Sequence, residues 1–272
     1  YYSESEFFTD QSNLDLKIQK IIASFEKEMN EYINNVNLMI DSQKMISIGI
    51  SISKKLDGSN LRQNNVQFLI QEAKQQILKY YTNYNIIHII INNYKIDGVD
   101  YFHLPDNIKC NSISLDMLFI CIPNDVVLFY KKIFLKSNIL INQIICSSYV
   151  KSINYKDNLD LNGHVSFIDI GFNKTSIISS FNDKVLFLDV LPIGGNHITK
   201  DISKILKIDL EQSEQIKLNI DKEHKLSNDG DFLLDKLQKI IFARTEEILE
   251  LCTKSIKSKS FIIDNFKMVL TR

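Results

Sequence analysis

Apolar residues recur along this chain with two periods, one typical of helices and one typical of strands. Residues 13–30 carry an apolar side chain at every third or fourth position, which predicts an amphipathic helix. Residues 45–53 alternate isoleucine with serine or glycine, the pattern of a strand that is buried on one face. A polar segment containing Asp57 and Gly58 follows, and we expect a turn over residues 55–60.

The next part of the chain predicts a small α+β unit followed by a return strand and helix. The expected elements, in order, are a helix over 66–81, a strand over 86–91, a hairpin-like turn over 92–99, a strand over 112–121, a helix over 123–134, a strand over 139–145 and a helix over 146–153. His88 interrupts the first of these strands, and no second ligand-type residue lies at metal-binding spacing from it. We therefore expect a structural histidine there.

Residues 165–191 predict three strands joined by two polar turns. The first strand ends at Asp169, a turn over 172–175 leads into the second, and a turn over 182–183 leads into a third over 184–191. The first turn forms a hairpin tip that presents backbone N–H groups, a hydroxyl and a carboxylate together. Such a tip suits a polyphosphate, with Asp169 able to hold a hydrated magnesium ion. An ordinary hairpin with a polar tip is the alternative.

A glycine pair follows the third strand. Gly194 and Gly195 come shortly before Thr199 in the sequence. We expect Thr199 to cap a helix that begins at Lys200 or Asp201. A helix N-terminus behind a glycine turn stabilises phosphate through its free N–H groups and the helix dipole. The glycine pair is therefore a second candidate phosphate contact.

The remaining pattern predicts further helices and two short strands. The helices are expected over 201–206, 210–218 and 232–252, and the strands over 261–263 and 268–271. Glu214 and Lys217 lie three residues apart and so share one helix face. This pair could hydrogen-bond a ribose, or it could be an ion pair on the surface.

Three motifs in this region resemble one protein family. They are DIGxxxT over 169–175, PxGGxxITxDI over 192–202 and SExxK over 213–217. In this order and spacing they resemble the bacterial cell-division protein FtsA, a member of the actin-like ATPases. Residues 86–99 and 104–120 also resemble the family's 1C subdomain, which distinguishes FtsA from actin and from the chaperone ATPases.

The resemblance implies an α/β fold of the actin-like ATPase (ribonuclease H-like) type with an inserted FtsA-type 1C (SHS2) α+β subdomain. The implied boundaries are 1–53 for part of subdomain 1A, 54–136 for 1C, 137–164 for the return to 1A, 165–201 for 2A with the phosphate hairpin, 202–260 for 2B and 261–272 for the start of the return to 2A.

The resemblance also implies a cell-division protein that binds ATP and magnesium, polymerises, and tethers FtsZ filaments to the inner face of the cytoplasmic membrane at the septum. Such an adaptor would be a weak ATPase at most, and no residue is marked as a catalytic base. The C-terminal tail of FtsZ would bind subdomain 2B. Asp169 would hold magnesium through water. The other implied nucleotide contacts are Gly171, Asn173, Lys174 and Thr175 at the phosphates, Gly194 and Gly195 beside them, and Glu214 and Lys217 at the ribose or base.

Three features of the family pattern are not found in this sequence. No DxG hairpin precedes the first helix, and no Gly-Gly adenosine turn follows Thr271. The C-terminal amphipathic helix by which FtsA lies on the membrane is missing as well. We therefore expect either an incomplete copy of a longer protein or a degenerate scaffold that binds no nucleotide.

Two other classes share the implied fold. A pilus-assembly scaffold of the PilM type would be expected to lack the ITxDI block, which this chain has at residues 198–202. A kinase of the sugar-kinase branch would need a substrate-binding acid near the domain cleft and a differently inserted first domain, and neither is evident in the sequence.

Composition narrows the class further. Hydrophobic residues at 44% and charged residues at 24% are typical of a soluble globular protein, and a net charge of −1 gives no reason to expect nucleic acid as a partner. The four cysteines show no metal-ligand spacing, so we expect reduced, mostly buried thiols of a cytoplasmic protein. The sequence shows no secretion signal or bilayer-spanning apolar run, so membrane association would be peripheral.

Overall fold

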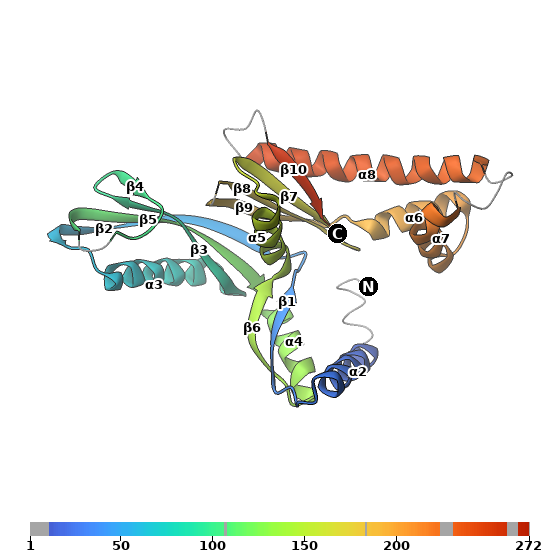
Figure 1. Cartoon of the computed structure of the whole chain (residues 1–272), viewed down its shortest axis with the longest axis horizontal. Helices are drawn as coiled ribbons and strands as arrows, with labels where there is room; N and C mark the ends of the chain where they lie inside the picture. The colour runs from blue at the N-terminus through green and yellow to red at the C-terminus, as the bar shows by residue number, and fades with distance from the viewer. Residues whose placement is uncertain (1–10, 106–107, 183, 224–230, 260–265, 272) are drawn as a thin grey trace.

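The computed structural model describes residues 11–105, 108–182, 184–223, 231–259 and 266–271. In these residues the strands form three sheets, with helices packed beside them (Figure 1). The mixed order of helices and strands confirms the predicted α/β class. None of the described helices is long and apolar enough to cross a bilayer.

The first sheet pairs two strands from distant parts of the chain. β1 (Asn35–Ile40) runs parallel to β6 (Leu140–Cys146). Two helices lie beside it at the lower end of Figure 1, α2 (Gln11–Met29) and α4 (Asn124–Lys136). The periodicity of the sequence predicts both helices and β6, but it does not predict β1. On α2 the apolar side chains of Leu16, Ile21, Phe25 and Met29 are exposed.

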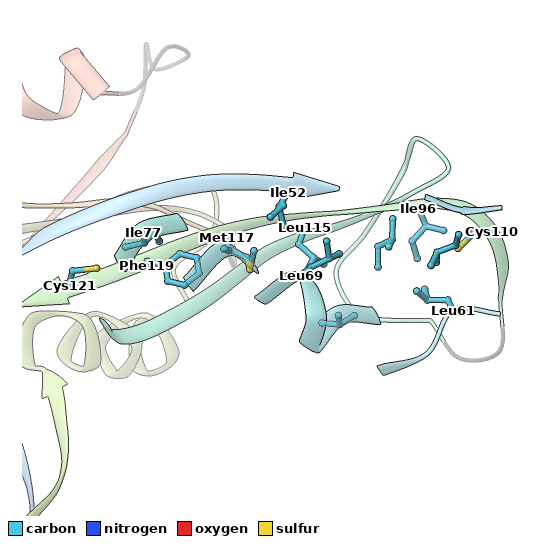
Figure 2. Packing of buried hydrophobic residues seen from close by; sticks show 14 residues of the cluster. Ile52, Leu61, Leu69, Ile77, Ile96, Cys110, Leu115, Met117, Phe119 and Cys121 are labelled. Carbon is cyan, nitrogen blue, oxygen red and sulfur yellow. The ribbon is translucent and has the colours of Figure 1, made fainter. Parts of the chain in front are cut away.

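The second sheet is antiparallel, with the strand order β2-β5-β3-β4. Its strands are β2 (Ile46–Asn60), β3 (Tyr84–Ile96), β4 (Val99–Tyr101) and β5 (Lys109–Pro123). The helix α3 (Gln63–Tyr80) covers one face. Figure 2 shows the buried side chains of this core, among them Leu69, Leu115 and Phe119. The alternating isoleucines of β2 contribute to the same core, as the sequence predicts.

The turn expected over residues 55–60 is wrong. β2 continues to Asn60 and pairs with β5 on both sides of an irregularity between Lys55 and Ser59. Asp57 and Gly58 do adopt positive φ angles, 49° and 79°, but they form a bulge within the strand. The Asp-Gly signal is local, whereas the pairing with β5 extends beyond it. The implied subdomain boundary between residues 53 and 54 consequently falls inside β2.

A second Asp-Gly pair does form a turn. The hairpin turn expected over 92–99 is confined to Asp97 and Gly98, whose φ angles of 46° and 86° are those of a two-residue hairpin. The Asp97 carboxylate accepts the N–H groups of Asn111 and Ser112 and so fixes the turn against β5.

The third sheet contains the predicted phosphate hairpin. Its strands are β7 (His164–Ile170), β8 (Thr175–Phe181) and β9 (Lys184–Leu191) in an antiparallel meander, with β10 (Lys267–Thr271) parallel to β7. The helix α8 (Asp231–Lys259) packs on one face through residues that include Ile248 and Ile256. The helix α5 (Ser147–Leu159) contacts β8 from the other face. The strand predicted over 261–263 lies outside the described residues.

Two further helices form a cluster with α8 at the right of Figure 1. They are α6 (Gly195–Leu206) and α7 (Leu210–Glu223), and they share a small core around Ile202 and Leu237. The start expected for α6 is wrong, because this helix begins at Gly195 rather than at Lys200. Thr199 is therefore not an N-cap but lies in the second turn.

The second and third sheets meet along the edge strand β9. The hydroxyl of Ser47 donates to the carbonyl of Leu188 (2.7 Å) and accepts its N–H (3.0 Å). The amide of Asn92 makes the same pair of bonds with Val185, at 2.7 and 3.0 Å. Side chains of the second sheet therefore occupy hydrogen-bonding groups of an edge strand that would otherwise be open.

Candidate functional site

The predicted hairpin and the predicted glycine pair come together in the structure. At the tip of the β7–β8 hairpin the N–H of Gly171 donates to the carbonyl of Lys174 (2.9 Å), which closes the turn. The N–H of Gly195, the first residue of α6, donates to the carbonyl of Gly171 (2.9 Å). The next N–H, that of Asn196, donates to the carbonyl of Phe172 (2.7 Å). The N-terminus of α6 is thereby docked on the hairpin tip.

Gly194 is required at this junction because there is no room for a side chain. A Cβ at this position would lie 2.4 Å from the carbonyl oxygen of Gly171, and 2.8 Å from both the carbonyl oxygen of Phe172 and the nitrogen of Lys174. Its φ angle of −168° is open to any residue, so backbone freedom is not the reason. At Gly195 the nearest atom to a Cβ would be Nζ of Lys217, at 3.5 Å, which is an ordinary contact.

The docking also uses the N–H groups that were expected to face phosphate. Besides Gly195 and Asn196, the N–H of Gly194 donates to Nδ1 of His197 (3.1 Å), and the N–H of His197 donates to the carbonyl of Gly194 (2.9 Å). These are the backbone donors that a helix N-terminus leaves without intrahelical partners. Because they have partners here, an anion at this site would be met by side chains instead.

Thr175 and Asn173 take different orientations at the tip. The hydroxyl of Thr175, which was expected to face phosphate, donates inward to the carbonyl of Ile193 (2.7 Å), and the residue is fully buried. The Oδ1 atom of Asn173 accepts a bond from the side chain of Asn196 (2.8 Å). Its Nδ2 atom is buried and has no partner among the residues described. A buried donor without an acceptor is costly, so Asn173 suits a ligand oxygen at this point.

Glu214 and Lys217 are joined to the same site. The Nζ of Lys217 donates to Glu214 (2.6 Å), to the hydroxyl of Thr199 (2.8 Å) and to the carbonyl of Gly195 (3.2 Å). It also lies 5.8 Å from the centre of the Phe172 ring, within cation–π range. The Lys217 side chain is 15% exposed, so the pair is not a solvated surface ion pair but part of the junction between α6, α7 and the hairpin.

Asp169 has a partner that the sequence did not suggest. Its Oδ2 atom lies 2.8 Å from Nζ of Lys151 on α5. Burial alone would lower the pKa of Lys151, but the hydrogen bond to Asp169 and the charges of Asp169 and Asp41 outweigh it, and the pKa is raised. The two residues are 18 positions apart and belong to a helix and the strand that follows it. Only the packing of α5 on the sheet brings them together.

His88 has a structural role, as expected from the sequence. His88 accepts the N–H of Cys146 at Nε2 (2.9 Å), and its ring packs edge-on against Tyr149, with ring centres 5.0 Å apart. Burial lowers the pKa of His88, which favours the neutral ring that this acceptor role needs.

Comparison with known proteins bears on the same region. The family described as cell division protein FtsA matches residues 166–236, which contain the hairpin, the glycine pair and the Glu214–Lys217 pair. The FtsA of Buchnera aphidicola subsp. Schizaphis graminum is 24% identical over 73% of this chain and 50% of its own length. That of Buchnera aphidicola subsp. Baizongia pistaciae is 24% identical over 89% of this chain and 60% of its own length. The chain is a distant homologue of the FtsA proteins.

The chain spans about half the length of the curated relatives it matches. Among solved structures, a chain of the PilM-PilN type IV pilus biogenesis complex superposes with a TM-score of 0.58 at 12% identity, covering 87% of this chain and 62% of that one. At this identity the likeness concerns the fold alone, and it supports the actin-like ATPase fold that the motifs implied.

The residues around the hairpin fit a polyphosphate better than they fit magnesium. Lys174 at the tip, Lys217 beside it and the unpartnered Nδ2 of Asn173 are the groups an anion would need. The carboxylate of Asp169 is already paired with Lys151. No cluster of three or more His, Cys, Asp or Glu side chains able to hold a metal occurs in the described part of the chain. Magnesium at Asp169 is therefore a poor fit to this site.

Proposed function

We propose that this chain binds the polyphosphate of ATP at the tip of the β7–β8 hairpin and acts as an actin-like adaptor in bacterial cell division. The observation that carries the proposal is the docking of α6 on the hairpin tip in a homologue of FtsA. This docking gathers Lys217 and the unpartnered amide of Asn173 beside Lys174.

Each residue of the junction has a distinct proposed role. Lys174 and Lys217 supply positive charge to the phosphates, and Asn173 donates its Nδ2 hydrogen atoms to a phosphate oxygen. Glu214 holds Lys217 in place and can accept a ribose hydroxyl. The glycines at 171, 194 and 195 form the close contact that positions these side chains, rather than binding the ligand themselves.

The adaptor role rests on the homology. Like the FtsA proteins it resembles, the chain would polymerise, bind the C-terminal tail of FtsZ through the helical cluster of α6, α7 and α8, and act at the inner face of the cytoplasmic membrane at the septum. We assign the sheet formed by β2 to β5, with α3 and α4, to subdomain 1C, which then begins at Ile46. Hydrolysis of ATP would be weak, since we assign no residue of the described part of the chain as a catalytic base.

Isothermal titration calorimetry with ATP tests the nucleotide site. Lys217→Met is expected to weaken ATP binding about tenfold, because the phosphates would lose the attraction of its positive charge, about 1.4 kcal/mol. Lys239→Met is the matched control, since Lys239 is a 75%-exposed lysine of α8 paired only with Asp235 in the structure as described. An unaltered affinity in Lys217→Met would place ATP elsewhere. Failure of the wild-type chain to bind ATP would favour a scaffold that needs no nucleotide.

A separate measurement tests the adaptor role. Fluorescence anisotropy of a labelled peptide with the sequence of the FtsZ C-terminal tail is expected to rise on titration with the chain. A scrambled peptide of the same composition is the control. Equal binding of both peptides would contradict a specific FtsZ site.

A further inference from the structure

A lysine holds the carboxylate that the family pattern assigns to magnesium. Lys151 lies near the start of α5, and its Nζ is 2.8 Å from Oδ2 of Asp169 near the end of β7. Figure 1 shows α5 beside the sheet that contains β7 and β8. The side chain of Asp169 is only 14% exposed, so little of its surface remains for a second cation.

The neighbouring carboxylate has protein partners as well. Asp41 follows β1 and caps the N-terminus of α5, because its two carboxylate oxygens each accept the N–H of Ser148 at 3.2 Å. The hydroxyl of Ser148 donates to the same group at 3.2 Å. The charges of Asp41 and Lys151 attract each other across this first turn. One ammonium group thus lies near two carboxylates, and each carboxylate already has a partner within the protein.

A magnesium ion would have to compete with this arrangement. Magnesium keeps a rigid octahedral shell, at about 2.0–2.1 Å, and in phosphate sites it binds through one or two carboxylates and the phosphates themselves. The ammonium group of a lysine is also a compact positive charge, and it has three hydrogen-bond donors. We propose that Lys151 replaces magnesium as the cation at Asp169, so that this hairpin binds the polyphosphate of a nucleotide without a divalent metal. The inference rests on the function proposed above.

The geometry leaves Lys151 able to serve a ligand as well as Asp169. Its side chain is 38% exposed, and an ammonium group with one bond to Asp169 keeps two further donors. Lys174 belongs to the turn at the hairpin tip, and Lys217 bonds the first residue of the docked α6. Three lysines around one tip supply the positive charge that a metal contributes in related phosphate sites.

Calorimetry of ATP binding in excess EDTA and in excess magnesium chloride tests the inference. The wild-type chain is expected to give the same Kd in both buffers. Lys151→Met is expected to bind about tenfold more weakly in EDTA and to recover in magnesium, because the freed Asp169 can then take the ion. Lys151→Arg keeps the charge and should behave as wild type. The control is Lys156→Met, on the same helix, whose ammonium bonds the carbonyl of Asn182 instead.

A second readout needs no nucleotide. Magnesium alone should raise the thermal midpoint of Lys151→Met and leave that of the wild-type chain unchanged. An equal rise in the wild-type chain would overturn the inference. ATP binding by the wild-type chain only in magnesium would also overturn it and leave the proposed function standing. No ATP binding in either buffer would overturn the proposed function and the inference together.

Discussion

The carbonyl oxygen of Gly171 lies 2.4 Å from the point where a Cβ on Gly194 would stand, so the hairpin tip and the start of α6 touch backbone to backbone. Gly194→Ala is therefore expected to lower the free energy of unfolding by about 1–3 kcal/mol, since neither backbone can give way easily. Gly195→Ala is the matched control, because a methyl there meets only ordinary contacts and improves helix propensity by up to about 1 kcal/mol. Thermal unfolding followed by circular dichroism measures the midpoints of the two variants, and only that of Gly194→Ala is expected to fall. Equal effects of the two substitutions would contradict the docked junction.

The bonds between Asn92 and Val185 predict a second effect on stability. Asn92→Ala leaves the N–H and the carbonyl of Val185 without their partners, which is expected to cost about 1–3 kcal/mol. Hydrogen exchange should show loss of protection at the Val185 amide in particular. Asn85→Ala, on the same strand but exposed, is expected to change stability by about 0.5 kcal/mol or less. Unchanged protection at Val185 would mean that the edge of β9 is held by the apolar core alone.

Asp189 makes stability depend on pH. It accepts bonds from Lys259 (2.8 Å) and from the hydroxyl of Ser255, and so fixes the end of α8 to β9. Burial by itself would raise the pKa of Asp189, but these bonds outweigh it and the pKa is lowered below 3.8. A lowered pKa means that the stabilisation is present above pH 3.8 and is lost as the pH falls through the folded-state value.

Asp189→Asn is accordingly expected to lower the thermal midpoint clearly at neutral pH and progressively less as the pH falls through the folded-state pKa of Asp189, where the wild-type carboxyl becomes protonated and loses its charge. Asp235→Asn is the control, because Asp235 is 57% exposed and its pair with Lys239 is a surface pair. A difference in thermal midpoint between Asp189→Asn and wild type that stays constant as the pH is lowered through the acid range would show that the charge of Asp189 is not responsible.

Local patterns in the sequence predict the elements of this fold well, because each one depends on neighbouring residues. The meander of β7, β8 and β9 follows directly from apolar runs separated by polar turns. The Asp57-Gly58 pair shows the limit of such signals. Its positive φ angles are present, but the partner strand β5 decides whether they make a turn or a bulge.

The candidate site is less accessible to sequence reasoning, because its key contacts join distant segments. The motifs identify Gly171 and Gly194, but they do not show that the two backbones are in contact. This contact places the start of α6 at Gly195 and gives the first N–H groups of the helix partners in the hairpin. The pairing of Lys151 with Asp169 has no local signal at all. The packing of α5 on the sheet, where Ser148 and Ser152 are buried, brings the two charged groups together.

The thiols of this chain are shielded from solvent. All four cysteines are unpaired and buried, namely Cys110, Cys121, Cys146 and Cys252. Burial raises the pKa of Cys121 to about 11 and that of Cys146 to about 12, with Asp41 adding to the latter, so the reactive thiolate is scarce at pH 8. We expect a disulfide reagent such as Ellman's to modify all four thiols in denaturant and to react far more slowly with the native chain. Ser258→Cys adds an exposed thiol on α8 and should react at once, which controls for reagent and pH. Rapid modification of the native wild-type thiols would show that these cores open readily.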